Sequence, residues 1–381
     1  MLSSTFSKFF ESEKTGGFLL IFCTLISMAL ANSSLSAAYL DIWETPIAGM
    51  SLAHWVNDAL MAIFFLLVGL ELERELYSGE LSEFKNALLP IVAAVGGIVV
   101  PAFIHYSLNA GTPTQPGAGI PMATDIAFAL GVLALLGSRI PASLKVFLTA
   151  LAVMDDLGAI LVIAIFYTAQ LSEAYLLAAL AVFLFLIMLN RVFRVMALFP
   201  YLLGGAVMWF LMLKSGVHAT LTGVLLAFAI PYSARAEDET SPSHRLEHWL
   251  HRPVAFVILP IFALANTGIV ISPGWQEAFF SANSLGIMGG LVLGKPIGIA
   301  LFSFAAVMLG ICALPRELRW THIVGAGFLG GIGFTMSIFV TNLAFSGNPD
   351  LITGSKIAIL VASLVAGSCG FLWLSLFGRR A

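Results

Sequence analysis

Long apolar runs, separated by short polar or turn-forming stretches, dominate the chain. A membrane-spanning helix needs about 20 mostly apolar residues, and runs of about this length recur from one end of the chain to the other. We predict twelve spans, at approximately residues 17–32, 54–76, 86–108, 118–137, 144–168, 174–190, 197–213, 217–231, 252–271, 284–310, 321–345 and 356–377. The pattern therefore predicts an all-α integral membrane protein that forms a single transmembrane domain over residues 1–381. We expect the first run to remain as an uncleaved helix rather than to act as a signal peptide.

Composition supports this class and excludes an ordinary water-soluble fold. The chain is 59% hydrophobic and 10% charged, against about 45–50% and 25% in soluble domains. Cys23, Cys312 and Cys369 fall in or beside apolar runs at unrelated spacings, which predicts neither a disulfide framework nor a metal site. Residues 325–330 (GAGFLG) formally match a dinucleotide fingerprint, but they lie in an apolar span with no preceding strand. We therefore expect no cofactor and no nucleic-acid partner.

The lysines and arginines of the loops predict the orientation. With the N-terminus placed in the cytoplasm, almost all of them fall on the cytoplasmic side, and only Lys214 and Lys356 fall outside. Both termini are then cytoplasmic. The external loop 33–53 contains a weak strand-like alternation at residues 39–46 (YLDIWETP), and the charged loop 232–252 is cytoplasmic.

Charged residues inside the apolar runs are the candidates for function. Asp155 and Asp156 are adjacent in the middle of the fifth span, where each carboxylate costs roughly 2.5–3.5 kcal/mol on insertion scales. Lys295 lies deep in the tenth span and Asp125 in the fourth. Neighbouring helix residues point about 100° apart, so only one of the two adjacent acids can face Lys295. The other would look into a cavity shared with Asp125, and spacing alone does not say which acid takes which place.

Glycines predict that two spans are interrupted and that one helix approaches its neighbour closely. Gly290, Gly294 and Gly298 recur every fourth residue in the tenth span, the small-residue spacing of closely packed membrane helices. The eleventh span is rich in glycine just before residues 334–337 (FTMS), and the fourth contains Pro121, so both can unwind in mid-membrane. Each is the middle member of a three-span group. The two groups insert in opposite orientations, as in inverted-topology transporters, and we expect the two broken helices to cross at an ion site.

Five segments together resemble the NhaA family of sodium/proton antiporters, over essentially the whole chain. They are residues 123–128 (ATDIAF), 154–160 (MDDLGAI), 216–220 (GVHAT), 294–296 (GKP) and 330–337 (GGIGFTMS). The resemblance implies a secondary transporter, not an enzyme, in the bacterial inner membrane. It would be an electrogenic, pH-regulated exporter of Na⁺ or Li⁺ in exchange for external H⁺, surrounded by lipid and homodimeric.

The resemblance also implies residue roles. Asp156 would be the principal Na⁺ and Li⁺ ligand, and Asp155 would ligate or gate the cation and pair with Lys295 in its absence. Thr124 and Asp125 would lie at the crossing, where Asp125 would oppose positive helix ends and Lys295 negative ones. The broken backbone would include Gly330, Gly331 and Gly333, and the loop at residues 33–53 would form a dimerisation hairpin. A cytoplasmic cluster would set the pH response, with a contribution from His218; its members would be Glu71, Arg74, Glu75, Glu247 and His248.

Two features of that cluster leave its behaviour open. Position 73 is glutamate where the family commonly has lysine, which changes the charge balance. His244, His248 and His251 share a helix face with the neighbouring Glu247, a pattern that fits a pH sensor, a metal site or simply a solvated helix end.

Two other functions fit parts of the sequence. A sodium-coupled symporter of an organic anion could use the same fold, but it would need a polar cavity for its solute. An intramembrane aspartyl protease would also bury two acids, but it needs facing aspartates on separate helices, and the usual Gly-x-Gly-Asp signature is absent.

Overall fold

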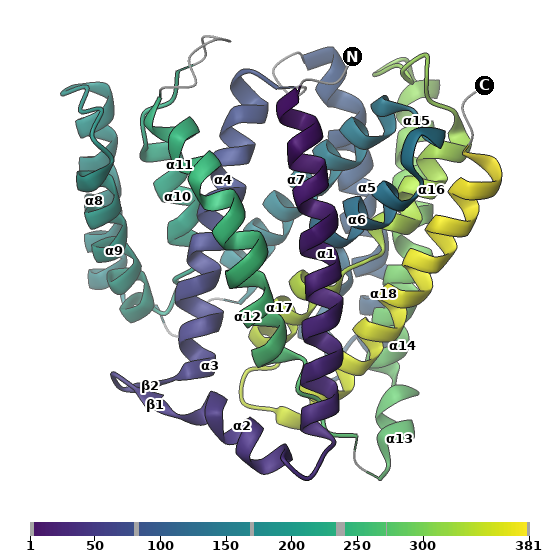
Figure 1. Cartoon of the computed structure of the whole chain (residues 1–381), viewed down its shortest axis with the longest axis horizontal. Coiled ribbons are helices and arrows are strands. Elements are labelled where there is room, and N and C mark those ends of the chain that lie inside the picture. Colours follow the sequence, from purple (N-terminus) through teal and green to yellow (C-terminus); the bar gives the residue numbers. More distant parts are fainter. Residues whose placement is uncertain (1–3, 80–83, 168–170, 234–240, 272, 379–381) are drawn as a thin grey trace. The chain divides into compact units, whose positions relative to one another are not determined.

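The computed structural model is almost entirely helical (Figure 1). It describes residues 4–79, 84–167, 171–233, 241–271 and 273–378. The chain forms two compact units, one made of Met1–Leu40, Glu83–Ala159 and Asn266–Ala381 and the other of Asp41–Ser82 and Ile160–Ala265. We call these unit 1 and unit 2.

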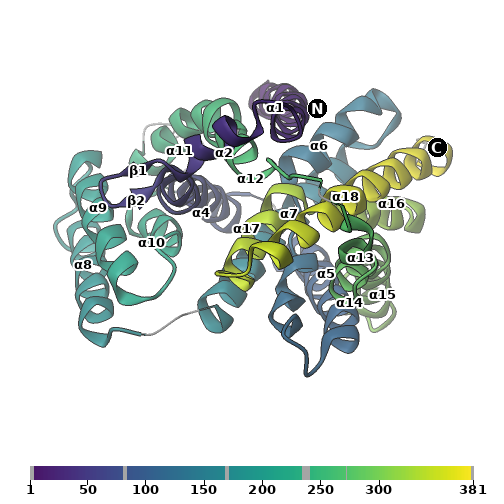
Figure 2. The same cartoon turned by 90° about the horizontal axis from the view of Figure 1, so that it is seen from below.

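Unit 1 contains both of the three-span groups predicted from the sequence. Its regular elements are α1 (Ser4–Ala31), α5 (Phe84–Asn109), the 3₁₀ helices η3 (Gln115–Met122) and η4 (Gly137–Arg139), α6 (Ile126–Leu135), most of α7 (Ala142–Phe166), α13 (Trp275–Phe279), α14 (Ala282–Gly289), the π-helical turn η6 (Gly290–Gly294), α15 (Lys295–Met308), α16 (Trp320–Gly330), α17 (Phe334–Ala344) and α18 (Pro349–Phe377). Figure 2 shows α5, α14 and α15 side by side, and α16 lies against α18.

Unit 2 contains the remaining helices and the only sheet in the described residues. Its elements are the end of α2 (Ser36–Glu44), strands β1 (Pro46–Ile47) and β2 (Met50–Ser51), α3 (Leu52–Trp55), the π-helical turns η1 (Val56–Leu60) and η5 (Val254–Ile258), α4 (Met61–Tyr77), α8 (Glu173–Arg191), α9 (Leu198–Ser215), α10 (Leu221–Ala229), α11 (Pro242–Pro253) and α12 (Leu259–Asn266). The strands pair antiparallel, with Pro46 opposite Ser51.

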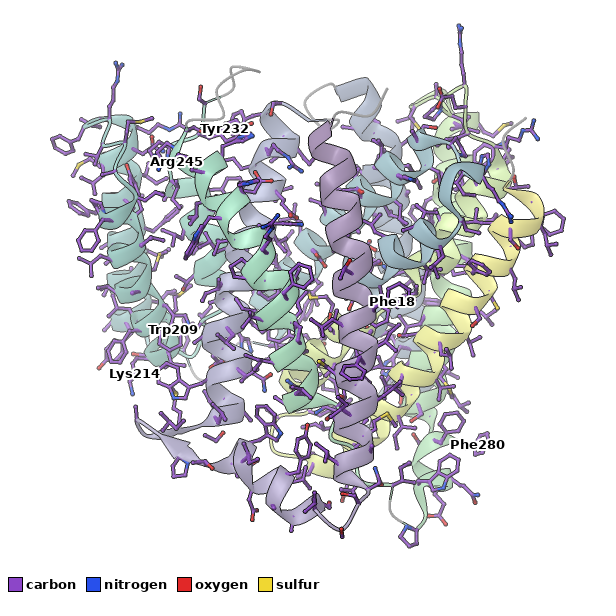
Figure 3. All side chains as sticks on the ribbon, viewed as in Figure 1. Phe18, Trp209, Lys214, Tyr232, Arg245 and Phe280 are labelled. Atoms are coloured by element: carbon purple, nitrogen blue, oxygen red, sulfur yellow. The ribbon has the colours of Figure 1, made fainter. Side chains whose placement is uncertain are left out.

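The helices are long and apolar enough to cross a membrane. Among the described residues nine helices meet this criterion, or up to eleven if each of two bent pairs counts as one span. Their outer faces expose large apolar side chains, for example Phe18 on α1 and Phe280 beside α13 (Figure 3), as expected of surfaces in contact with lipid. The predicted all-α membrane fold is confirmed.

The prediction of twelve spans is not confirmed. Eleven of the predicted segments match the nine helices and the two bent pairs. The twelfth, residues 217–231, contains only the nine-residue helix α10, which at 1.5 Å per residue reaches about 14 Å, less than half of a bilayer core.

Two of the predicted loops are partly helical. Residues 36–44 form α2 instead of the strand-like segment expected at residues 39–46, and the strands lie later, at Pro46–Ser51. Packing overrides the weak alternation, because the Tyr39 hydroxyl bonds to Ser27 Oγ at 2.8 Å and its ring lies against Gly268. The predicted loop 232–252 also contains α11 from Pro242 onward. Ser241 caps this helix by accepting a hydrogen bond from His244 N. Residues 234–240 lie outside the described part.

Candidate cation site

Two interrupted spans of unit 1 cross, as the glycine and proline pattern predicts. In the fourth span the chain is extended between η3 and α6, with ψ of 149° at Ala123 and 100° at Asp125. In the eleventh, α16 and α17 meet at an angle of 48°. The breaks bond to each other, because Asp125 N donates to Ile332 O at 2.6 Å. Backbone groups freed in the membrane are thus satisfied by the opposite break.

Two glycines in the break between α16 and α17 leave no room for a side chain. A Cβ added at Gly331 would lie 2.3 Å from Leu291 O, and one added at Gly333 would lie 2.1 Å from Ser337 Oγ. At Gly330 the nearest atom would be 3.2 Å away, on the side chain of Ile299. Two of the three predicted broken-helix glycines therefore sit where no larger residue fits without movement.

Asp125 joins the N-terminal ends of two half-helices. It is the N-cap of α6, where its Oδ1 accepts a hydrogen bond from Phe128 N at 3.1 Å. Its Oδ2 accepts from Thr335 N at 3.1 Å, at the start of α17, and from the Thr335 hydroxyl. A helix N-terminus carries partial positive charge, so one carboxylate here faces two positive helix ends, as predicted.

Lys295 pairs with Asp155. The ammonium group donates to Asp155 Oδ2 and, at 3.0 Å, to Thr124 Oγ1. Both side chains of the ion pair are 0% exposed. The Thr124 hydroxyl lies 2.6 Å from Asp155 Oδ2 and 2.8 Å from Gly330 O, so its one proton has two acceptors. The structure thus settles which of the two adjacent acids meets the lysine.

The two adjacent carboxylates have different surroundings. Asp155 Oδ2 is held by Lys295 and Thr124, whereas Asp155 Oδ1 has no hydrogen-bond partner among the described residues and faces the bare backbone of Gly97. Asp156 is 1% exposed and close enough for its charge to act on Lys295. The predicted cavity shared by Asp156 and Asp125 remains a prediction.

The glycine stripe brings Lys295 close to α5. A Cβ added at Gly298 would lie 2.1 Å from Gly96 O, and one added at Gly294 would lie 2.8 Å from Pro101 Cα. The predicted close approach is confirmed. The partner, Gly96 on α5, was missed from the sequence, although Gly96 and Gly97 stand between two prolines of an apolar helix and could have indicated it. The π-helical turn η6 ends directly before Lys295, as such turns often do beside functional residues.

The predicted pH-response residues lie in unit 2, mostly on α4 and α11. Arg74 donates to Glu247 Oε1 at 2.7 Å and to Glu75 Oε1 at 3.2 Å. Glu71 Oε1 lies 3.9 Å from His251 Nδ1. The structure therefore brings the acids of α4 and α11 together around one arginine.

Glu73, the acid that departs from the family pattern, is 4% exposed and accepts a hydrogen bond from Ser243 Oγ at 3.0 Å. Ser243 was not identified from the sequence, and nothing in its neighbourhood along the chain indicates the contact.

Within the described ranges the remaining histidines form no metal site. His218 Nε2 lies 3.0 Å from Tyr167 O, between α9 and α10, and the charge that acts on it is that of Asp58. His248 is exposed on α11, where its charge reaches Glu247. In the part of the chain that the structure describes, no group of three or more His, Cys, Asp or Glu residues could hold a metal ion. The three cysteines are free.

Comparisons with known proteins give one consistent family. The family model described as Na⁺/H⁺ antiporter 1 matches residues 7–374. The chain is 73% identical over 379 residues to a Na⁺/H⁺ antiporter NhaA of Dechloromonas aromatica, covering 100% of this chain and 97% of that protein. It is 59% identical over 373 residues to Na⁺/H⁺ antiporter NhaA 1 of Flavobacterium johnsoniae, covering 98% and 97%.

One solved structure shares the fold. It is that of the sodium proton antiporter MjNhaP1 of Methanocaldococcus jannaschii at pH 8, with a TM-score of 0.54 at 14% identity, covering 96% of this chain and 92% of that one.

Proposed function

The chain belongs to the NhaA family of Na⁺/H⁺ antiporters and exchanges Na⁺ for H⁺ across a membrane, and we propose that the exchange takes place at Asp155 and Asp156. Na⁺ or Li⁺ binds these carboxylates in competition with protons, with Asp156 as the principal ligand. The transporter exports the cation and takes up external H⁺. Membership of a Na⁺/H⁺ antiporter family argues against the organic-anion symporter, the alternative that the sequence left open.

One observation carries this assignment: a fully buried lysine–carboxylate pair lies at the crossing of two broken helices. Lys295, Asp155 and Thr124 are all 0% exposed and bonded to one another. An intramembrane charge is costly and marks an ion path by default. Irregular backbone at membrane depth is tolerated only where it is buried or lines a cavity, which supports the same place as the cation site.

Exchange follows from competition for the same oxygens. Carboxylate oxygens are ligands that suit hard cations, and the same oxygens bind protons. Two carboxyl groups and one ammonium offer more than one proton site for each cation. This supports an electrogenic cycle, which gains about 2.3 kcal/mol per charge from each 100 mV of membrane potential.

The α4–α11 contacts support pH regulation. Glu71, Glu75 and Glu247 all act electrostatically on Arg74, so three carboxylates share one positive charge. We place Glu73 in the same cluster, because Ser243 holds its buried carboxylate between the two helices. His248 acts electrostatically on Glu247, and His218 contributes from the turn between α9 and α10, where its Nε2 lies 3.0 Å from Tyr167 O.

We place the protein in the bacterial inner membrane with both termini cytoplasmic. Within unit 2, Tyr232 and Arg245 lie at one end and Lys214 at the other (Figure 3), as the distribution of basic residues requires. The hairpin of β1 and β2, inside the predicted dimerisation loop, supports a homodimer: its Ile47 is 47% exposed and could pack against a second copy.

The test is dissipation of a pH gradient in proteoliposomes after addition of Na⁺, Li⁺ or K⁺. We expect Na⁺ and Li⁺ to discharge the gradient with the parent protein and not with Asp156→Asn. Asp350→Asn, at an exposed acid in the first turn of α18, is the matched control and should behave as the parent does. Unchanged apparent Na⁺ affinity in Asp156→Asn would refute the site. Clamping the membrane potential at zero should speed the exchange if the cycle is electrogenic.

A further inference from the structure

His322, in the first turn of α16, is bonded through both ring nitrogens to the backbone. Its Nδ1 accepts a hydrogen bond from Arg319 N at 2.9 Å, and its Nε2 lies 3.1 Å from Gly378 O. The residue is 2% exposed. Because Nδ1 accepts and a carbonyl cannot donate, the proton is on Nε2, and the imidazole must be neutral to make both bonds.

This histidine takes the part of the acid or amide in a capping box. Arg319 is the N-cap of α16 and His322 is the third residue of the helix, the position from which a Glu or Gln side chain usually reaches back to the N-cap N–H. Glutamine can make this bond at any pH. Histidine can make it only while neutral.

The bond from His322 Nε2 to Gly378 O joins α16 to α18, which lies beside it in Figures 1 and 2. Gly378 directly follows the last residue of α18. The same two helices are joined by Trp373 Nε1, which donates to Thr321 O at 2.9 Å. A Cβ added at Gly325 would lie 2.3 Å from Leu374 Cδ2, so the first turns of α16 press against the last turns of α18.

The opposite end of α16 is part of the cation site. Gly330 O accepts from the Thr124 hydroxyl, and a Cβ added at Gly327 would lie 2.6 Å from Cα of Pro296, the residue after Lys295. At 1.5 Å per residue, His322 is about 12 Å along the helix from Gly330. The helix α16 is short and closely packed, so a change in the contacts of its first turn also affects Gly330, whose carbonyl accepts the hydrogen bond from Thr124.

We propose that His322 is a titratable positioning residue that holds α16 in the cation-binding arrangement while its imidazole is neutral. A proton taken up at Nδ1 removes the acceptor for Arg319 N and puts a positive charge at a helix N-terminus, where it is unfavourable. The loosened half-helix then supports Thr124 less well, and antiport falls at acid pH. The proposed role of His322 rests on the proposed antiport activity. It is separate from the pH response that we assign to the α4–α11 contacts.

The charged groups around the imidazole favour its neutral form. On its own side Arg319 acts on it electrostatically, and Glu317 bonds to Ser143. Among the described residues the packed helices contribute no nearby carboxylate: α6 has no titratable residue, α15 has Lys295 at the cation site, and α18 has Cys369, with Asp350 and Lys356 close to its far end.

The variant His322→Gln tests the proposal, because glutamine keeps an acceptor and a donor and cannot titrate here. We expect the ratio of antiport at pH 5.5 to antiport at pH 8, with equal pH on both sides, to rise about twofold above the parent's, the change that corresponds to protonation of half of the parent's imidazoles at pH 5.5. His54→Gln, at a half-exposed imidazole of unit 2, is the matched control and should leave the ratio unchanged. His322→Ala, which loses the cap, should be impaired at both pH values.

Hydrogen exchange gives a readout that does not need transport. Amides in the first turn of α16 should exchange faster in the parent than in His322→Gln at pH 5.5, and equally at pH 8. An unchanged activity ratio together with equal exchange would overturn the role of His322 while leaving Na⁺-driven antiport by the parent intact. Absence of antiport in the parent would instead refute the proposed function.

Discussion

Replacing Lys295 by methionine removes a buried charge and keeps a side chain of similar length. The ammonium group of the parent is 0% exposed and bonds to Asp155 and Thr124. In Lys295→Met the Asp155 carboxylate loses its counter-charge in an apolar interior. Breaking a buried pair on one side only is strongly destabilising, because it leaves one charge uncompensated.

The expected loss is about 3–5 kcal/mol. For a unit of roughly 230 residues, each kcal/mol lowers the unfolding temperature by about 2–4 °C, so the midpoint should fall by about 6–20 °C. A proton on the lone carboxyl group relieves the cost. The loss should therefore be larger at pH 8 than at pH 6.

The double variant Asp155→Asn/Lys295→Met separates this pair from general damage to the core. With neither charge present, most of the lost stability should return, so the coupling free energy in the mutant cycle should be at least as large as the stability that returns. Thermal unfolding in detergent can be followed by a thiol-reactive dye, since Cys23 is buried. Lys214→Met, at an exposed lysine, is the matched control and should cost less than about 1 kcal/mol. A double variant no more stable than Lys295→Met would refute the reasoning.

Two further predictions use the same assay. Gly298→Ala should lower the free energy of unfolding by about 1–3 kcal/mol and abolish most antiport, because its Cβ would lie 2.1 Å from Gly96 O. The control Gly131→Ala, whose Cβ would have no atom within 4 Å, should be neutral or slightly stabilising, and equal effects at the two glycines would contradict this. Asp125→Ala should lower the free energy of unfolding by about 1–3 kcal/mol or more, because it leaves the N–H groups of two helix ends unsatisfied. The control Asn348→Ala, at an exposed N-cap, should cost about 1 kcal/mol at most, and a smaller loss at Asp125 than at Asn348 would show that Asp125 is not needed to cap these helices.

The interruptions could be predicted because they follow from local chemistry. Pro121 has no N–H to continue a helix, and the closely spaced glycines before Phe334 weaken one, so both spans were expected to unwind in mid-membrane; the structure interrupts them at residues 123–125 and 331–333. The charges in apolar runs were equally visible, since each is costly in lipid and needs a partner inside the protein.

The choice between Asp155 and Asp156 could not be made from residues alone. It depends on the rotation of α7 about its axis, which is set by packing against distant segments. One such contact is at Gly158, where an added Cβ would lie 2.2 Å from Ile98 Cδ1. Only the resemblance favoured Asp155, and the structure bears out that pairing.

Contacts between distant polar residues were beyond the sequence for the same reason. Glu73 and Ser243 are separated by 170 residues, and each looks ordinary in its own segment. The helix α2 is set by Tyr39 and its contacts with Ser27 and Gly268, which a local alternation of strand-like residues cannot reveal.

The charges of the proposed cation site argue for obligatory exchange. The Asp125 carboxylate already faces two helix N-termini, and the Asp155 carboxylate already faces Lys295. A cation that entered this buried group without the departure of a proton would leave an uncompensated charge in an apolar interior, which costs several kcal/mol. Departure of the cation without proton uptake would do the same. At the proposed site, burial of these carboxylates would therefore penalise both half-steps of uncoupled movement.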